Sequence, residues 1–505
     1  MRRNSIALTY TASVRPGFRR VMVAIAVLAL SAPTGLAGQA NVARVIEQIR
    51  EEATQRGQAV ALFEHLTIAI GPRLTASPAF KESIDWAQAR FQQWGLANVH
   101  TEPFDFGRGW TLEKLTLEMT APRYFPLTGY PEAWSPGTRA MIEGQPVYIG
   151  DRTMEQLESM RTELRGAIVL AAPPQDRFIE EDRIQPADTD ERVRIGAPPS
   201  IRMQGPVPAR ELSAFLQQAG AAAMLRPSMG EHGTIFVLGN RNTQNDAVPS
   251  IVMMAEHYNM LVRMTQSNVA PTLRLQLDVR FHEQDTNAYN VLAEIPGTDA
   301  ALRDEVVMIG AHIDSWHSSP GATDNADGTA AVMEAMRILK AIGAQPRRTI
   351  RAALWGGEEQ GLLGSRAWAE RHLAGEANAT AREMLSVYFN DDPGTGATYG
   401  FYAEEDPAAK EILDGWLRAL SSAGVRKNVI DHIGSTDHLA FTALGVPGFT
   451  AIKDYVEYDV RTHHTNVDFF ERIPGEDVVQ SAIVMAAFAY QAAMRDQAFP
   501  RPAAR

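Results

Sequence analysis

The spacing of apolar residues changes several times along the chain, and each change predicts a different kind of element. Between residues 42 and 93 apolar side chains recur every three or four positions, which is typical of helices that bury one face. A loop with glycine and proline at residues 71–78 divides this stretch, so we predict two helices. Residues 99–106 and 112–119 alternate apolar with polar positions, which predicts two edge strands.

The sequence pattern changes between residues 126 and 285. In this segment short apolar runs are separated by proline and glycine. The clearest predicted strands are residues 166–170, 221–225 and 248–253. The charged stretch 176–194 predicts a solvated loop or a lid. This segment therefore reads as a smaller, β-rich domain.

Strand-like and helix-like segments alternate from residue 290 to the end of the chain. The predicted strands are residues 290–295, 305–310, 349–355, 385–389 and 448–452. The predicted helices are residues 328–342, 360–371, 408–420 and 477–494. This alternation predicts an α/β fold with a mostly parallel central sheet covered by helices on both faces. Such sheets bind ligands beyond the carboxyl ends of their strands.

The N-terminus is basic and then apolar. Residues 1–20 contain five arginines and no acidic residue, and residues 21–30 form an uninterrupted apolar run. This run is shorter than the roughly 20 residues that a spanning helix needs, so we predict a signal peptide over residues 1–40, cleaved near Ala37 or Ala40. The alternative is an uncleaved N-terminal anchor. No other stretch predicts a membrane span in the mature protein.

Composition narrows the chemistry. The chain has 505 residues, no cysteine and a formal net charge of −12. Losing residues 1–40 would remove five arginines and no acid, which gives −17 for the exported chain. Nucleic-acid binding needs clustered lysine and arginine, so an acidic chain argues against it. Without cysteine, any metal must be bound by histidine and carboxylates.

Acidic and histidine side chains gather just after the predicted strands. The set comprises His312, Asp324, Glu359, Asp392 and His464. Some acidic residues in these segments also have structural interpretations. Asp327, at the start of a predicted helix, is read as an N-cap, and Glu358 and Glu359 could lie in the first turn of a helix. The recurrence of such residues at several strand ends favours a metal site instead.

The donor set suits two zinc ions, with manganese or cobalt as substitutes. Five side chains are too many for one catalytic zinc, but they satisfy two ions when one carboxylate bridges them. Such a site hydrolyses substrates with a metal-activated water. Glu358, next to the ligand Glu359, is then placed as the general base.

The motifs around these residues resemble the co-catalytic di-zinc exopeptidases. The matching segments are residues 310–316, 321–328 and 358–365. This family includes bacterial leucyl aminopeptidases, glutamate carboxypeptidase and carboxypeptidase Q, and the motifs look most like the last branch. The resemblance implies His312 and Asp392 on one zinc, Glu359 and His464 on the other, Asp324 between them, and Asp314 orienting the ligand histidine.

The resemblance also implies a domain plan. The catalytic domain would comprise residues 41–125 and 286–498, and residues 126–285 would be a protease-associated insert domain. The implied activity is hydrolysis of terminal peptide bonds in short peptides, outside the cytoplasm, in the periplasm or beyond the cell. Glutaminyl cyclisation and a non-catalytic binding relative of this fold are the alternatives. The substrate end, the side-chain preference and the oligomeric state, including a homodimer, stay open.

Some positions depart from the family pattern. Many of its aminopeptidases have tyrosine directly before the last ligand histidine, where it helps hold the oxyanion, but this chain has His463. Tyr455, Tyr458 or His463 could supply that donor. His438 occupies a position that belongs to the substrate pocket in some relatives. Asp391 is the alternative to Asp392 as a ligand.

Overall fold

The structure is a computed structural model that describes residues 34–184, 207–242 and 247–501. Residues 1–47 and residues 48–505 form two compact units. Most of the predicted signal peptide and residues 185–194 of the predicted charged loop lie outside the described residues. The N-terminal helices are α2 (Thr34–Arg56), α3 (Ala59–Glu64), η1 (His65–Ile70) and α4 (Pro78–Gln93). A loop over residues 71–77 precedes α4, as predicted.

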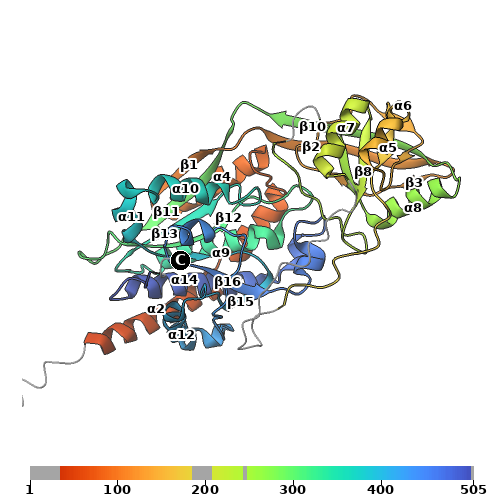
Figure 1. The fold of residues 1–505 in the computed structure, drawn as a ribbon. Helices are drawn as coiled ribbons and strands as arrows, with labels where there is room; N and C mark the ends of the chain where they lie inside the picture. The colour runs from red at the N-terminus through yellow and green to blue at the C-terminus, as the bar shows by residue number, and fades with distance from the viewer. Residues whose placement is uncertain (1–33, 185–206, 243–246, 502–505) are drawn as a thin grey trace, which may run out of the picture. The chain divides into compact units, whose positions relative to one another are not determined.

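A seven-stranded sheet forms the centre of the larger unit (Figure 1). In spatial order its strands are β1 (Ala97–Asp105), β11 (Asn287–Ile295), β13 (Thr349–Trp355), β12 (Val306–His312), β14 (Leu385–Asn390), β16 (Gly448–Asp454) and β15 (Thr395–Phe401). The four strands β13, β12, β14 and β16 are mutually parallel. The other three strands pair antiparallel. The α/β prediction is confirmed, but the parallel arrangement holds only for the centre of the sheet.

Helices cover both faces of this sheet. α9 (Asp327–Ala341) and α14 (Gly475–Met494) pack together on one face. On the other face α10 (Leu363–His372) and α13 (Leu439–Thr442) share a core with β12, β13 and β14. The remaining helices of this part are α11 (Ala379–Met384), α12 (Pro407–Leu420), η3 (Ala322–Ala326), η4 (Glu376–Asn378), η5 (Ser421–Ala423), η6 (Tyr458–Thr462) and η7 (Phe470–Arg472).

One described helix, α14, is long and apolar enough to cross a membrane by length and composition alone. However, 78% of its apolar window is buried inside the fold. It packs against α9 and β15. Its apolar surface is therefore accounted for by the core of the protein.

Two smaller sheets lie in the segment predicted as β-rich. One has the order β3 (Phe125–Pro126), β2 (Gly109–Ala121), β10 (Thr272–His282) and β5 (Ile142–Gly144). The other has the order β4 (Gly129–Pro131), β9 (Ser250–Met253), β8 (Ala223–Pro227), β7 (Ile168–Leu170) and β6 (Val147–Tyr148). The helices are α5 (Met154–Ser159), α6 (Arg161–Leu164), α7 (Ala209–Ala219) and α8 (Ala255–Gln266). The three clearest predicted strands correspond to β7, β8 and β9.

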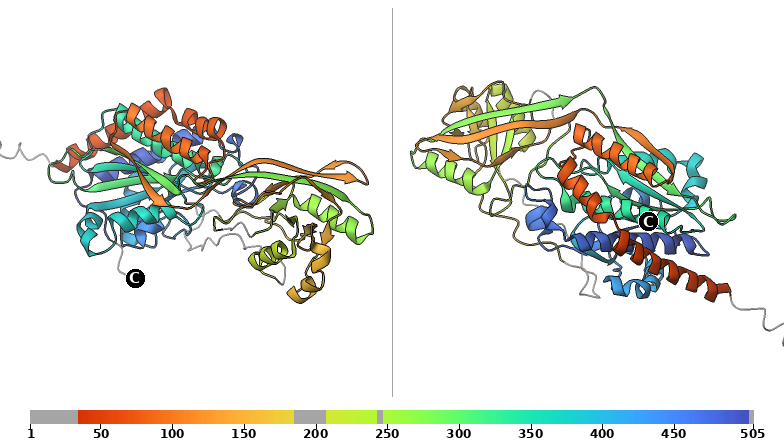
Figure 2. Two further views of the ribbon diagram at one scale, coloured as in Figure 1. Left: turned by 90° about the horizontal axis from the view of Figure 1, so that it is seen from above. Right: turned by 180° about the vertical axis from the view of Figure 1, so that it is seen from behind.

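Both small sheets share one hydrophobic core, to which β2 and β10 contribute alternate residues such as Leu117, Met119 and Leu275. β2 and β10 run side by side along their whole length (Figure 2). Because β2 also pairs with β3, the prediction that it is an edge strand is wrong. Its alternation reports one buried face, and that pattern carries no information about neighbours within the sheet.

Candidate metal site

The carboxyl ends of three adjacent parallel strands carry the candidate site. β12 ends at His312, β13 is followed by Glu358 and Glu359, and β14 is followed by Asp392. Because these strands are parallel neighbours, their ends meet at one edge of the sheet. The two glutamates lie in a loop that precedes α10, so the interpretation of a first helical turn is wrong. Leu362, with φ of 61°, separates that loop from the helix.

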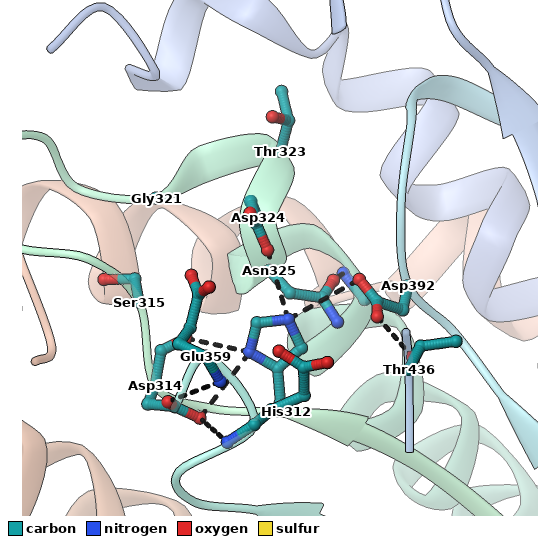
Figure 3. Close-up of polar contacts among 12 residues, drawn as sticks. His312, Asp314, Ser315, Gly321, Thr323, Asp324, Asn325, Glu359, Asp392 and Thr436 are labelled. Atoms are coloured by element: carbon teal, nitrogen blue, oxygen red, sulfur yellow. Dashed lines mark hydrogen bonds and ion pairs between the residues drawn. The ribbon is translucent and has the colours of Figure 1, made fainter. Parts of the chain in front are cut away.

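Asp324 reaches the site from η3, in a loop after β12 (Figure 3). The φ and ψ angles of Asp324 are not helical. The fully buried Arg73 holds this loop through hydrogen bonds to its main chain. The Arg73 guanidinium donates to the main-chain oxygens of Leu66, Gly71, Ile313, Pro320 and Gly321.

Two clusters share the carboxylate of Asp324. In the first, His312 Nε2 lies 3.2 Å from Asp324 Oδ1 and 3.5 Å from Asp392 Oδ1. In the second, His464 Nε2 lies 3.2 Å from Asp324 Oδ2 and 2.9 Å from Glu359 Oε2. The structure therefore brings together the five side chains that the sequence singled out as ligands, with one carboxylate oxygen turned to each cluster.

Two of the donor atoms are buried and have no hydrogen bond. His312 Nε2 and Glu359 Oε1 have no hydrogen-bond partner among the described residues. Buried polar atoms are normally paired, so such atoms need another partner. Divalent cations satisfy imidazole nitrogen and carboxylate oxygen together. The residues present therefore fit a metal ion in each cluster.

Electrostatics point the same way. Burial by itself would lower the pKa of His464, but the carboxylates of Glu359 and Asp324 raise it to about 10. Burial raises the pKa of Glu359 to about 7, with the neighbouring charge of Asp324 acting in the same direction. Both shifts arise because several carboxylates share a small dry volume. The site therefore favours added positive charge, which a metal ion supplies.

Asp314 connects the ligand histidine with the glutamate loop. Its main-chain oxygen lies 3.1 Å from His312 Nδ1. Its carboxylate accepts from the N–H groups of Glu358 and Glu359, at 3.3 and 3.4 Å, and from the hydroxyl of Thr75 at 2.8 Å. One buried aspartate thus fixes the ring of His312 and both glutamates, the kind of support that tunes metal ligands.

A buried ion cluster lies beside the site. Lys453 Nζ lies 2.5 Å from Asp327 and 2.8 Å from Asp391. The prediction that Asp327 caps α9 is wrong, because Asn325 Oδ1 accepts the N–H of Gly328 instead. A Cβ at Gly328 would lie 2.5 Å from the main-chain oxygen of Asp391, so glycine is required there. Asp391 faces a lysine, whereas Asp392 faces His312.

Several supporting residues were not found from the sequence. Arg73 and Thr75 lie more than 200 positions before the loop that they hold, and no local pattern signals that contact. Thr436 donates to Asp392, and Asp468 accepts from the N–H groups of Thr323 and Asp324. Asp468 follows His464 by four positions, and the family resemblance implies an aspartate at that spacing from the ligand histidine; the sequence did not reveal its contacts with Thr323 and Asp324.

The other histidines have separate environments. His438 is fully buried, with Nδ1 2.9 Å from the hydroxyl of Thr450 and Nε2 3.2 Å from Glu404. His463 lies beside His464 and close enough to Asp324 to be a further donor. A third group, Glu405, Asp431 and His432, shares no residue with the two clusters, and two of its members are exposed.

Known proteins are similar to this chain in sequence and in fold. Residues 290–489 match the model of peptidase family M28. Human carboxypeptidase Q is 23% identical over 476 residues, covering 91% of this chain and 93% of its own. The crystal structure of a peptidase M28 precursor from Shewanella amazonensis has a TM-score of 0.68 at 25% identity, covering 92% of this chain and 99% of its own.

A zinc aminopeptidase from Bacillus subtilis shares the fold, with a TM-score of 0.56 at 20% identity over 85% of this chain and 93% of its own. The fold and the site together define a peptidase of the hydrolase class. The match to the model of peptidase family M28 covers residues 290–489, the part that holds the central strands and the candidate site.

Proposed function

We propose that the chain is a zinc exopeptidase that binds two metal ions. The observation that carries this proposal is the position of Asp324, whose two oxygens each lie 3.2 Å from the Nε2 atom of a different histidine. A carboxylate placed in this way could offer one oxygen to each of two metal ions. His312 and Asp392 would complete one site, and Glu359 and His464 the other. Imidazole and carboxylate donors suit zinc, with manganese or cobalt as substitutes.

The roles of the protein groups follow from their positions. Bound zinc would polarise the scissile carbonyl and lower the pKa of a water molecule towards neutrality. Glu358 would accept the proton of that water and later deliver it to the leaving amine. Asp314 would keep the base and the ligand Glu359 in place through their N–H groups.

The substrates are proposed to be short peptides, cut at a terminal bond. The names of the relatives support both a carboxypeptidase and an aminopeptidase, so the end that is trimmed needs a direct assay. A panel of free dipeptides, amino-blocked dipeptides and aminoacyl nitroanilides separates the choices. Cleavage of only the nitroanilides would identify an aminopeptidase, and cleavage of only the blocked dipeptides a carboxypeptidase.

Export and the insert domain complete the proposal. The basic and apolar N-terminus supports a signal peptide over residues 1–40, with the enzyme acting in the periplasm or outside the cell. Residues 126–285 are proposed as the protease-associated insert, and the pairing of β2 with β10 adds β2 to its core. Fractionation of cells that express the full chain or residues 41–505 tests export. Equal retention of both in the cytoplasm would contradict it.

Metal analysis of the purified protein tests the central claim. We expect about two zinc ions per wild-type chain and peptide hydrolysis that a chelator abolishes. Asp324→Ala should lose metal from both sites together with activity, because one carboxylate serves both. Asp304→Ala, at an exposed surface position, is the matched control and should keep both. Full metal content in Asp324→Ala would contradict the bridging role.

A further inference from the structure

The loop that follows β7 reaches from the insert to η6, the turn that precedes the ligand His464. Arg183, in this loop, donates from Nε and Nη2 to the two carboxylate oxygens of Asp459, at 2.8 and 2.6 Å. The main-chain N–H of Arg183 also donates to Asp459 at 2.8 Å. The carboxylate of Asp182 accepts from the N–H groups of Glu457 and Val460. The start and the middle of η6 are therefore tied to this loop.

The guanidinium of Arg183 also covers two aromatic rings. It lies 5.1 Å from the ring centroids of both Tyr455 and Tyr458. The side chain of Arg183 is only 11% exposed, and that of Asp459 is fully buried. A bidentate pair of this kind fixes orientation as well as charge. Arg183 therefore restricts where the Tyr458 ring can lie.

Three side chains near the site could donate a hydrogen bond to an oxyanion, and their environments differ. The hydroxyl of Tyr455 is 3.0 Å from that of Tyr402 and is already paired. The ring of His463 lies between the rings of Tyr458 and His464, at centroid distances of 5.0 and 3.8 Å. Tyr458 is 1% exposed, and among the described residues its hydroxyl has no pairing like that between Tyr455 and Tyr402.

The Tyr458 hydroxyl also lies within electrostatic reach of the metal ligands. After burial, the carboxylates of Asp324 and Asp392 are the strongest influences on the pKa of Tyr458, and all three raise it. Tyr458 stacks on His463, the residue adjacent to the ligand His464. A hydroxyl that no neighbouring side chain occupies stays available to donate a hydrogen bond to a ligand.

We propose that the Tyr458 hydroxyl is the hydrogen-bond donor to the oxyanion of the tetrahedral intermediate, and that Arg183 of the insert is the positioning residue that holds it there. This proposal rests on the proposed peptidase function. It departs from the family pattern, in which the tyrosine directly precedes the last ligand histidine. The insert would then complete the active site rather than only flank it.

The step balances without a further reactant. Addition of hydroxide to the carbonyl carbon forms a C–O bond and moves the π electron pair onto the carbonyl oxygen. Tyr458 donates a hydrogen bond to that oxygen and keeps its proton. When the intermediate collapses, the electron pair re-forms the carbonyl, the C–N bond breaks, and the amine takes the proton held by Glu358.

Tyr458→Phe and Tyr455→Phe, compared in the full-length zinc-loaded protein, test the donor. Loss of one oxyanion donor typically lowers kcat by about 10²- to 10³-fold. We expect that loss for Tyr458→Phe, with KM within about 3-fold, unchanged zinc content, and the same loss of affinity for a phosphonate dipeptide analogue of the tetrahedral intermediate. Tyr455→Phe should stay within about 3-fold of wild type, because Tyr402 already occupies its hydroxyl.

Arg183→Lys tests the positioning role, because lysine keeps the charge beside Asp459 but cannot form the two-pronged pair. It should lower kcat and phosphonate affinity together, without changing zinc content. If Arg183 acts through Tyr458, the same change made in Tyr458→Phe should have no further effect. Independent, multiplicative losses would overturn the positioning role.

The outcomes separate this inference from the proposed function. Near wild-type kcat and phosphonate affinity in Tyr458→Phe, beside an active wild type, would overturn the donor alone. A zinc-loaded wild type that hydrolyses no peptide would overturn the proposed function. The phosphonate measurement does not depend on turnover, so in that case equal binding by wild type and Tyr458→Phe would overturn the donor as well.

Discussion

At the residue scale, the neighbouring Glu358 and Glu359 have different surroundings, and this difference supports the separate roles proposed for them. Glu359 Oε2 lies 2.9 Å from His464 Nε2. The pKa of Glu358 is raised chiefly by burial, with His312 lowering it and Asp392 raising it further. Both N–H groups bond to Asp314, so the two glutamates share one anchor. The two residues are identical and adjacent in sequence, so the sequence does not distinguish them. The conformation of the loop between β13 and α10 gives them different neighbours.

Glu358→Gln should keep its metal and lose nearly all activity. Glutamine preserves the shape of the side chain but cannot accept the proton of the water, and a general base contributes about 10²- to 10⁴-fold to kcat. Steady-state kinetics and metal analysis of the same sample provide the measurement. Glu411→Gln, at an exposed position of α12, is the control. Turnover close to wild type in Glu358→Gln would refute the assignment of the base.

Thr75→Val should weaken metal binding without removing a ligand. The variant loses the hydroxyl that donates to the buried carboxylate of Asp314 at 2.8 Å. Changing a residue that orients a ligand typically costs about 10- to 100-fold in metal affinity. Competition with a chromophoric chelator measures that affinity. Thr54→Val on the exposed face of α2 should leave it unchanged, and an unchanged Thr75→Val would mean that Asp314 is held by its other contacts.

At the scale of elements, the site depends on how α9, β14 and β16 meet. Lys453 on β16 lies between Asp327, the first residue of α9, and Asp391, directly after β14. All three side chains are buried, with at most 2% of their surface exposed to solvent. The cluster thereby fixes the helix that follows Asp324 against the strand that precedes Asp392.

Lys453→Met should be strongly destabilising, because it leaves two buried carboxylates without a cation. Breaking a buried pair typically costs about 3 to 5 kcal/mol in the free energy of unfolding. Lys410→Met removes a half-exposed pair with Asp414 on α12 and should cost about 0 to 1 kcal/mol. Urea unfolding of both variants makes the comparison. Equal, small effects would mean that water reaches the cluster.

At the scale of the whole molecule, the loop after β7, in the proposed insert, contacts η6 through the pair of Arg183 and Asp459. Burial alone would raise the pKa of Asp459, but the hydrogen bonds and charge of Arg183 hold it below its usual value. A depressed carboxyl pKa adds stability above the unfolded pKa of about 3.9, and that stability disappears as the pH falls through the folded pKa.

Asp459→Asn should therefore be less stable than wild type at neutral pH, and the difference should shrink as the pH falls below about 4. The measurement is denaturant unfolding at a series of pH values. The chelated protein is measured at every pH, and the metal-loaded protein at neutral pH only. Asp304→Asn, at a side chain that is 84% exposed, is the control. A difference that does not depend on pH would exclude titration of Asp459 as its source.

The sequence by itself determined the α/β architecture and the residues that gather at the sheet edge. Periodicity identified most of the central strands, because each strand is a nearly continuous buried run of apolar residues. β15, with glycine at positions 396 and 400, lacked such a run and was missed. The metal-ligand candidates were recognisable because histidine and carboxylates recur at successive strand ends, where they are otherwise unusual.

Only the tertiary structure decided how these residues face one another and what supports them. Asp391 and Asp392 are adjacent in sequence, but one faces Lys453 and the other His312. Arg73, Thr75 and Arg183 support the site from distant parts of the chain. Such contacts arise from the packing of whole elements. The local pattern of apolar and polar residues does not indicate which distant side chain will contact a loop.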